Sequence, residues 1–162
     1  MRLDTVLFRP ARLGAWCVAV LVVAALVSCA KVPIVGGKPQ VSLKLTSTTV
    51  ANSCGKGTGN SLYFRVLQVT DATAVGSLTL AQLWDKEDKV LGPALVARSE
   101  DVIDAASSRE IKIERDPKAK AIVVVGNFCK TEGTCWRVIR PVSAGTSFKL
   151  QVDASCLSEV KR

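Results

Sequence analysis

The stretch Ala121-Ile122-Val123-Val124-Val125 is a run of five consecutive apolar residues, and it follows the turn-forming segment Asp116-Pro117-Lys118. Alternation between polar and apolar residues is the mark of a strand with one face in solvent. A short apolar run without alternation is instead typical of a strand in the middle of a sheet. The stretch therefore predicts a central strand, around which the other elements of the chain can be placed.

Shorter segments on both sides of this run alternate polar and apolar residues, which predicts further strands. They lie at residues 41–45, 62–69, 108–113, 136–139 and 148–152, with a weaker candidate at 100–103. Seven or so short strands with turns between them predict an all-β fold, an antiparallel β-sandwich. One helical segment is expected at residues 75–88, where Ser77 can cap the start and Leu91-Gly92-Pro93 follows the end.

The first 28 residues have the character of an export signal. Arg2, Arg9 and Arg12 precede thirteen uncharged residues, 15–27. This run is too short to cross a bilayer, which needs about 20 apolar residues, and it fits a signal peptide. An uncut N-terminal anchor helix is the alternative.

The apolar run ends in Leu26-Val27-Ser28-Cys29, which resembles the lipobox of bacterial lipoproteins. In such proteins the cysteine thiol accepts diacylglycerol, and small residues allow a signal peptidase to cut before it. We therefore expect a signal peptide at residues 1–28, a lipidated tether at 29–40 that starts with Cys29, and one domain at 41–162. Ala30 follows the cysteine, whereas an aspartate there usually retains a Gram-negative lipoprotein in the inner membrane. The expected location is the periplasmic face of the outer membrane.

The chain carries a formal charge of +8, and loss of the three arginines and one aspartate of the signal leaves +6. A basic domain can bind nucleic acid, but the expected export argues against such a partner. Anionic lipid, a cell-wall polymer or an acidic protein remain open as partners. A merely soluble surface is the simpler explanation of the charge.

Four cysteines lie in the expected domain: Cys54, Cys129, Cys135 and Cys156. An even number in an exported domain predicts two disulfides, for which three connectivities are possible. Cys129 and Cys135 flank five residues that resemble a hairpin tip, so we expect them to pair and to leave Cys54 with Cys156. A four-thiolate zinc site is the alternative, but the short spacings typical of such sites are missing.

The chain has no histidine, which excludes His-based catalytic triads and His-ligated metal sites. The glycine-rich segment Gly55-Lys56-Gly57-Thr58-Gly59 is not followed by a helical pattern, so it is a weak phosphate-binding candidate.

We expect Asp85, Glu87 and Asp88 to be solvated charges at a helix end. The tryptophans expected in the core are Trp84 and Trp136. We expect neither enzymatic activity nor a cofactor.

An ordered set of short motifs resembles the TssJ family, the outer-membrane lipoproteins of type VI secretion systems. The motifs are Arg65-Val66-Leu67-Gln68-Val69, Leu83-Trp84-Asp85-Lys86, Val90-Leu91-Gly92, Leu95-Val96-Ala97-Arg98, Asp116-Pro117-Lys118-Ala119 and Trp136-Arg137. The chain departs from the family pattern at Ala105-Ala106-Ser107-Ser108, where the family often has a Pro-Gly-Glu turn. It departs again at Phe128-Cys129, where an aromatic-Arg pair is common.

The resemblance implies a transthyretin-like β-sandwich that has no enzymatic activity and binds the periplasmic C-terminal part of TssM, an inner-membrane protein. The family's partner loop corresponds to residues 48–60, a stretch much longer than the two to five residues of an ordinary hairpin loop. The expected partner contacts are Thr49, Val50, Asn52, Ser53 and Lys56. The alternative function is a sandwich lipoprotein that binds a ligand or peptidoglycan, and a neighbouring gene for a TssM-like protein would separate the two.

We predict that Cys29→Ser abolishes lipidation, because the lipid would be attached through this thiol. Metabolic labelling with a fatty acid should mark the wild type and leave the variant unlabelled. Cys17→Ser is the matched control, since Cys17 lies inside the expected signal and should not affect labelling. Equal labelling of wild type and Cys29→Ser would exclude this cysteine as the lipid site.

Overall fold

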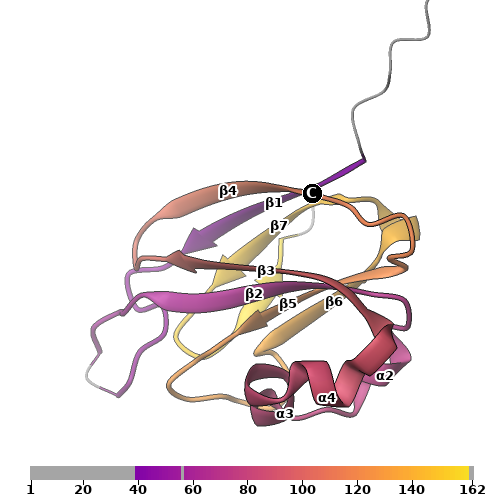
Figure 1. Cartoon of the computed structure of the whole chain (residues 1–162). Coiled ribbons are helices and arrows are strands. Elements are labelled where there is room, and N and C mark those ends of the chain that lie inside the picture. The colour runs from indigo at the N-terminus through magenta and orange to yellow at the C-terminus, as the bar shows by residue number, and fades with distance from the viewer. Residues whose placement is uncertain (1–38, 56, 161–162) are drawn as a thin grey trace, which may run out of the picture. The chain divides into compact units, whose positions relative to one another are not determined.

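The computed structural model describes residues 39–55 and 57–160, which form two packed sheets and a short helical segment (Figure 1). The strands are β1 (Gln40–Ser47), β2 (Leu62–Val69), β3 (Leu95–Ile103), β4 (Ser108–Glu114), β5 (Ala121–Gly126), β6 (Arg137–Pro141), β7 (Ser147–Val152) and β8 (Leu157–Glu159). Sheet A has the order β4-β1-β7-β8, and sheet B has the order β3-β2-β5-β6. The β-sandwich expected from the sequence is confirmed. Residues 1–38, with Cys29 and the expected signal and most of the tether, lie outside the described part.

The strands agree with the sequence pattern except at three points. β3 is longer than the weak candidate at residues 100–103, and β8 was not expected from the pattern. The third point is direction: β1 and β7 run parallel, while the other paired strands are antiparallel. A parallel pair needs a long connection, and here that connection contains the whole of sheet B.

β5 is buried along its entire length, as the apolar run predicts. Val66 pairs with Val124 across β2 and β5, and both side chains are buried in the core. The neighbouring residues Val123 and Val125 point to the opposite face of sheet B, and they too are buried. The helical segment covers this outer face, with α3 (Leu80–Asp85) packed against β5 (Figure 1).

The helical segment consists of three short helices, where the sequence pattern predicted one. They are α2 (Thr73–Gly76), α3 and α4 (Glu87–Leu91), followed by the 3-10 turn η2 (Gly92–Ala94). Thr79 adopts extended backbone and caps α3 in a capping box with Gln82, so the chain cannot continue from α2 as one helix. The expected cap at Ser77 was therefore wrong. None of the described helices is long and apolar enough to cross a membrane.

Arg137 at the start of β6 ties the helical segment to the sheet. Its guanidinium donates hydrogen bonds to the carbonyl oxygens of Val75 (2.9 Å) and Leu78 (2.5 Å). Burial against these groups lowers the pKa of Arg137. Carbonyl groups at the end of a helix need such donors, so one side chain satisfies the end of α2 and positions the segment.

Gln68 is a buried polar residue that connects the two sheets. Its amide nitrogen donates to the carbonyl oxygen of Glu114 (2.8 Å), and its amide oxygen accepts from the backbone N–H of Asp116 (2.8 Å). These bonds join β2 of sheet B to the end of β4 in sheet A. A buried amide with both ends satisfied fixes the spacing of the sheets at this point.

We predict that Gln68→Ala lowers the free energy of unfolding by about 2 to 4 kcal/mol, because two buried backbone groups lose their partners and a cavity forms. Chemical denaturation monitored by circular dichroism would measure the change. Gln40→Ala is the control, since Gln40 is exposed on β1 and its loss should change stability by less than about 0.5 kcal/mol. Equal stability of the two variants would mean that the bridge contributes nothing.

Candidate functional site

Four connections meet at the end of the sandwich where β1 ends, and we call them the disulfide pole. They are residues 48–61, 104–107, 127–136 and 153–156. The carbonyl oxygen of Thr48 accepts a hydrogen bond from the N–H of Ala106 (3.0 Å), and the N–H of Ser53 donates to the carbonyl oxygen of Ala154 (3.0 Å). Loops that are distant in the sequence are thus bonded into one surface.

Two disulfides join these loops: Cys54 to Cys129, and Cys135 to Cys156, with Cα–Cα distances of 5.3 and 5.0 Å. The expected pairing of Cys129 with Cys135 was wrong. These two cysteines do share one connection, but Cys129 faces the loop after β1, whereas Cys135 faces the turn between β7 and β8. Residues 127–136 are therefore covalently tied at both ends to other loops.

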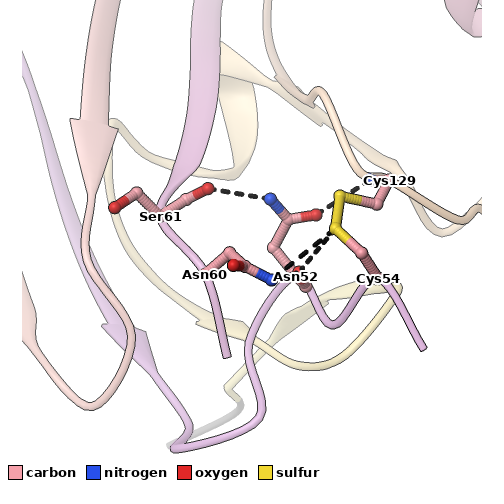
Figure 2. Close-up of a disulfide and its surroundings, with 5 residues drawn as sticks. All are labelled: Asn52, Cys54, Asn60, Ser61 and Cys129. Carbon is pink, nitrogen blue, oxygen red and sulfur yellow. Dashed lines mark hydrogen bonds between the residues drawn. A yellow bond between two sulfur atoms is a disulfide. The ribbon is translucent and has the colours of Figure 1, made fainter. Parts of the chain in front are cut away.

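Asn52 is the polar centre of the pole, and Figure 2 shows it between the disulfide and Ser61. Its side chain donates to the carbonyl oxygen of Ser61 and accepts from the backbone N–H of Cys129, both at 2.8 Å. Its own N–H donates to the carbonyl oxygen of Asp153 at 3.0 Å. It is only 5% exposed and has a positive φ of 49°, a conformation that asparagine tolerates better than most residues. One residue thus connects three loops.

Gly59 brings the end of the loop after β1 into contact with the start of the same loop. Its N–H donates to the carbonyl oxygen of Thr49 (3.1 Å). A Cβ at this position would come within 2.5 Å of that oxygen and 2.7 Å of the Ala105 Cβ, so only glycine allows the close approach. The loop is long because it crosses the pole and is bonded to its neighbours along the way.

The residues expected to contact a partner fall into different environments. Thr49 and Val50 are exposed, with Val50 at 41%, and Ser53 is half-buried. Asn52 is buried and its side chain is used inside the pole, so it does not fit the expected role at a partner surface. Lys56 lies outside the described residues.

Sequence reasoning missed Tyr63, which follows the loop at the start of β2. Its side chain is 64% exposed, the highest value among the large hydrophobic side chains that the structure describes as exposed. Its carbonyl oxygen accepts from the N–H of Asn127 (2.9 Å), which places it beside the connection that carries Cys129. Aromatic residues at the surface are frequent in interfaces. The length of the loop pointed to this region, but the alternating strand pattern could not show how exposed the Tyr63 side chain is.

Residues 39–155 match the family model described as type VI secretion lipoprotein, with the names VasD, EvfM and TssJ. The match covers well over half of the chain. The chain belongs to the TssJ family. TssJ proteins are structural lipoproteins of the secretion system and are not an enzyme family. A comparison with curated proteins found no match.

Solved structures share the TssJ fold of the described domain at low sequence identity. The type VI lipoprotein TssJ1 from Pseudomonas aeruginosa is 20% identical, with a TM-score of 0.70 over 77% of this chain and 97% of that chain. Lip from Serratia marcescens, a membrane-bound component of the type VI secretion system, is 16% identical, with a TM-score of 0.69 over 75% and 97%. A chain in a structure described as the TssM C-terminal domain from EAEC is 17% identical, with a TM-score of 0.68 over 76% and 98%.

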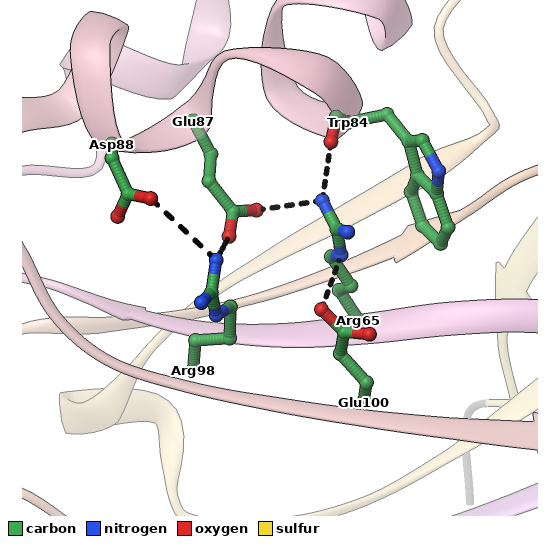
Figure 3. Close-up of polar contacts among 6 residues, drawn as sticks. All are labelled: Arg65, Trp84, Glu87, Asp88, Arg98 and Glu100. Atoms are coloured by element: carbon green, nitrogen blue, oxygen red, sulfur yellow. Dashed lines mark hydrogen bonds and ion pairs between the residues drawn. The ribbon is translucent and has the colours of Figure 1, made fainter.

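Three of the segments that carry the TssJ resemblance meet in a buried ion-pair cluster, shown in Figure 3. Glu87 is 3% exposed and lies between two arginines, Arg65 at 3.1 Å and Arg98 in direct contact. Its hydrogen bond with Arg98 raises the pKa of that guanidinium. Arg65 also stacks on the Trp84 ring, 4.2 Å from its centroid. Glu87 is therefore not the solvated charge expected from the sequence, because β2 and β3 supply both of its partners.

Arg65 and Arg98 belong to sheet B, whereas Glu87 and Trp84 belong to α4 and α3. The cluster therefore fastens the helical segment of this TssJ-family domain to β2 and β3. A buried carboxylate is costly unless it is paired and hydrogen-bonded, and here two arginines satisfy it. Among the described residues no group of three or more His, Cys, Asp or Glu side chains could hold a metal ion.

We predict that Asn52→Gly lowers the free energy of unfolding by about 2 to 3 kcal/mol, because the Cys129 N–H and the Ser61 carbonyl lose their partner. Glycine keeps the positive φ, so the change isolates the side-chain hydrogen bonds. Asn60→Ala is the control, since Asn60 is exposed and water can replace its bonds. Thermal unfolding under oxidising conditions measures both, and equal melting temperatures would remove Asn52 from the centre of the pole.

Proposed function

We propose that this lipoprotein attaches a type VI secretion membrane complex to the outer membrane by binding the periplasmic domain of a TssM-like inner-membrane protein. Membership of the TssJ family supports the secretion role. The similarity to a chain in the TssM C-terminal domain structure is consistent with this choice of partner. The outer-membrane location rests on Ala30 after Cys29 in the sequence. The observation that carries the proposal is the disulfide-linked pole, with Val50 exposed on it and Tyr63 exposed beside it.

The direction of β1 supports this arrangement. The described chain begins at Pro39, whose carbonyl oxygen accepts from the N–H of Arg115 (2.7 Å) at the start of β1. The disulfide pole begins at the other end of β1, eight residues later, a distance of about 26 Å along a strand. The disulfide pole and the N-terminal end of the described domain therefore lie at opposite ends of β1.

The pole is suited to binding because its loops are already ordered. Two disulfides and the Asn52 bonds hold residues 48–61 and 127–136 together. A preordered surface loses less conformational entropy when a partner binds. Val50 supplies exposed apolar area on the pole and Tyr63 supplies more beside it, at the start of β2. Tyrosine is a frequent hot-spot residue.

We predict that Val50→Asp weakens binding to the periplasmic C-terminal fragment of the TssM-like partner at least tenfold. Burial of an unpaired carboxylate in an apolar contact would be unfavourable, and tenfold corresponds to about 1.4 kcal/mol. Isothermal titration calorimetry with the lipoprotein in detergent measures the affinity.

Val160→Asp is the matched control for this experiment. Val160 is exposed to a similar degree, 45% against 41%, but it follows β8 and lies beside Lys149 of β7, away from the disulfide pole. The control should bind like the wild type. Wild-type affinity for Val50→Asp would move the interface away from the pole, and no binding by the wild type would reject the proposed partner.

A further inference from the structure

β3 is an edge strand that pairs with β2 and with no other strand in the described part of the chain. The carbonyl oxygens of Tyr63 and Val69 accept bonds from the β5 side, from Asn127 and Lys120 respectively. Backbone groups alternate in direction along a strand. The N–H and carbonyl groups of Phe64 and Val66 therefore point toward β3, where these residues pair with Asp101 and Ser99 respectively.

The residues between those ladder positions therefore direct their backbone N–H and carbonyl groups to the free edge: Arg98, Glu100 and Val102. The N–H of Val102 is bonded to the carboxylate of its neighbour Asp101 (2.8 Å). The N–H groups of Arg98 and Glu100 face outward from the sheet. Exposed edges of this kind accept an additional strand unless they are blocked.

Two grooves flank this edge, one on each face of sheet B. The outer groove has a volume of about 240 Å³ and is formed mainly by Tyr63, Trp84 and Val102. The inner groove is the seam between β3 and β4, with a volume of about 250 Å³. Its lining is half apolar (Phe64, Val66, Ile111 and Ile113) and half polar or charged (Ser99, Glu100, Asp101 and Lys112), and an ion pair between Arg109 of β4 and Asp101 of β3 (2.7 Å) bridges the two strands. Successive side chains of a strand point to opposite faces. A strand added to β3 would thus place alternate side chains in the two grooves.

We propose that an extended segment of the TssM-like partner pairs with the free edge of β3, which rests on the function proposed above. At alternating positions the segment has apolar side chains that face the Tyr63–Trp84 groove, and the positions between them have polar side chains that face the seam. It carries a Lys or Arg near Glu100, whose side chain is 55% exposed although it pairs with Arg65 at 2.9 Å. Backbone hydrogen bonds supply affinity in such strand addition, and the side-chain pockets supply specificity.

A second copy of this chain does not fit the same edge. Its own β3 would present Arg98 and Glu100 to the Tyr63–Trp84 groove, and Ser99 and Asp101 to the seam. Arg98 and Glu100 are charged, whereas Tyr63, Phe64, Trp84 and Val102 give the outer groove a mainly apolar lining. The occupant therefore differs in sequence from β3. Tyr63, which lines the outer groove, is also joined to the disulfide pole by the hydrogen bond from the N–H of Asn127 to its carbonyl oxygen.

The direct test is amide hydrogen exchange by NMR on the lipoprotein in detergent, with and without the partner's periplasmic C-terminal fragment. We expect the amides of Arg98 and Glu100 to exchange quickly in the free protein and at least tenfold more slowly in the complex. The ladder amides of Ser99 and Asp101 serve as internal controls, since β2 protects them in both states. Unchanged exchange at positions 98 and 100 in a saturated complex would overturn the proposal.

A matched pair of variants tests the backbone contribution. Glu100→Ala removes the carboxylate and keeps the N–H, whereas Glu100→Pro removes both and leaves the β2–β3 ladder intact. We expect Glu100→Pro to bind the fragment about tenfold more weakly than Glu100→Ala, since one edge hydrogen bond is lost and its partner group is left unpaired. Melting temperatures show whether Glu100→Pro is folded.

The outcomes separate the two proposals. If Glu100→Pro does not fold, Tyr63→Ser tests the outer groove, and wild-type affinity for Tyr63→Ser would overturn strand addition. A further outcome is that Val50→Asp weakens binding while Glu100→Ala, Glu100→Pro and Tyr63→Ser all bind the fragment with the same affinity. That result would support the TssM-like partner and overturn strand addition. Failure of the wild type to bind rejects both. A concentration-dependent dimer of the wild type that Glu100→Pro abolishes would assign the edge to a second copy and overturn the proposal.

Discussion

Sheet B must be covered on both faces, and the rest of the architecture follows from this requirement. Val123 and Val125 point away from the inter-sheet core, so water would contact them if nothing packed there. The helices between β2 and β3 supply that cover. They can stay in place because Glu87 is held by arginines of sheet B and because Arg137 satisfies carbonyl groups of the segment. Sheet A needs no such cover, since its outer face carries polar residues such as Lys44.

The disulfide pole solves a different problem, which is how to keep long loops in one conformation. A loop of this length would lose much conformational entropy on binding. Here the Cys54–Cys129 and Cys135–Cys156 bonds make residues 127–136 a bridge between two other loops. Asn52 completes the bridge with side-chain hydrogen bonds to the Ser61 carbonyl oxygen and the Cys129 N–H, which do not depend on the thiols. Covalent bonds and a buried polar network therefore both restrict the conformational entropy of the loops at the disulfide pole.

The two ends of the sandwich therefore have different roles in the proposed function. The N-terminal side of β1 leads toward the tether expected from the sequence, and the opposite end carries the disulfide-linked loops. The inferred partner edge on β3 extends from those loops, because Tyr63 borders both the loop and the outer groove. A partner that contacts loops and adds a strand would be held by side chains and by backbone groups together, as strand-addition complexes are.

The sequence by itself determined the features that depend on local periodicity: the buried strand of Ala121, the bounds of β2, and the sandwich that alternating strands require. It also carries the lipid motif at Cys29, whose role remains a prediction because it lies outside the described residues. Only the tertiary structure decided the cysteine pairing, the burial of Glu87 and Asn52, the break at Thr79 and the exposure of Tyr63. The cysteine pairing and the partners of Glu87 and Asn52 depend on which distant segments share one end or one face of the sandwich. Such contacts are set by strand order and packing, and a periodic pattern along the chain does not encode them.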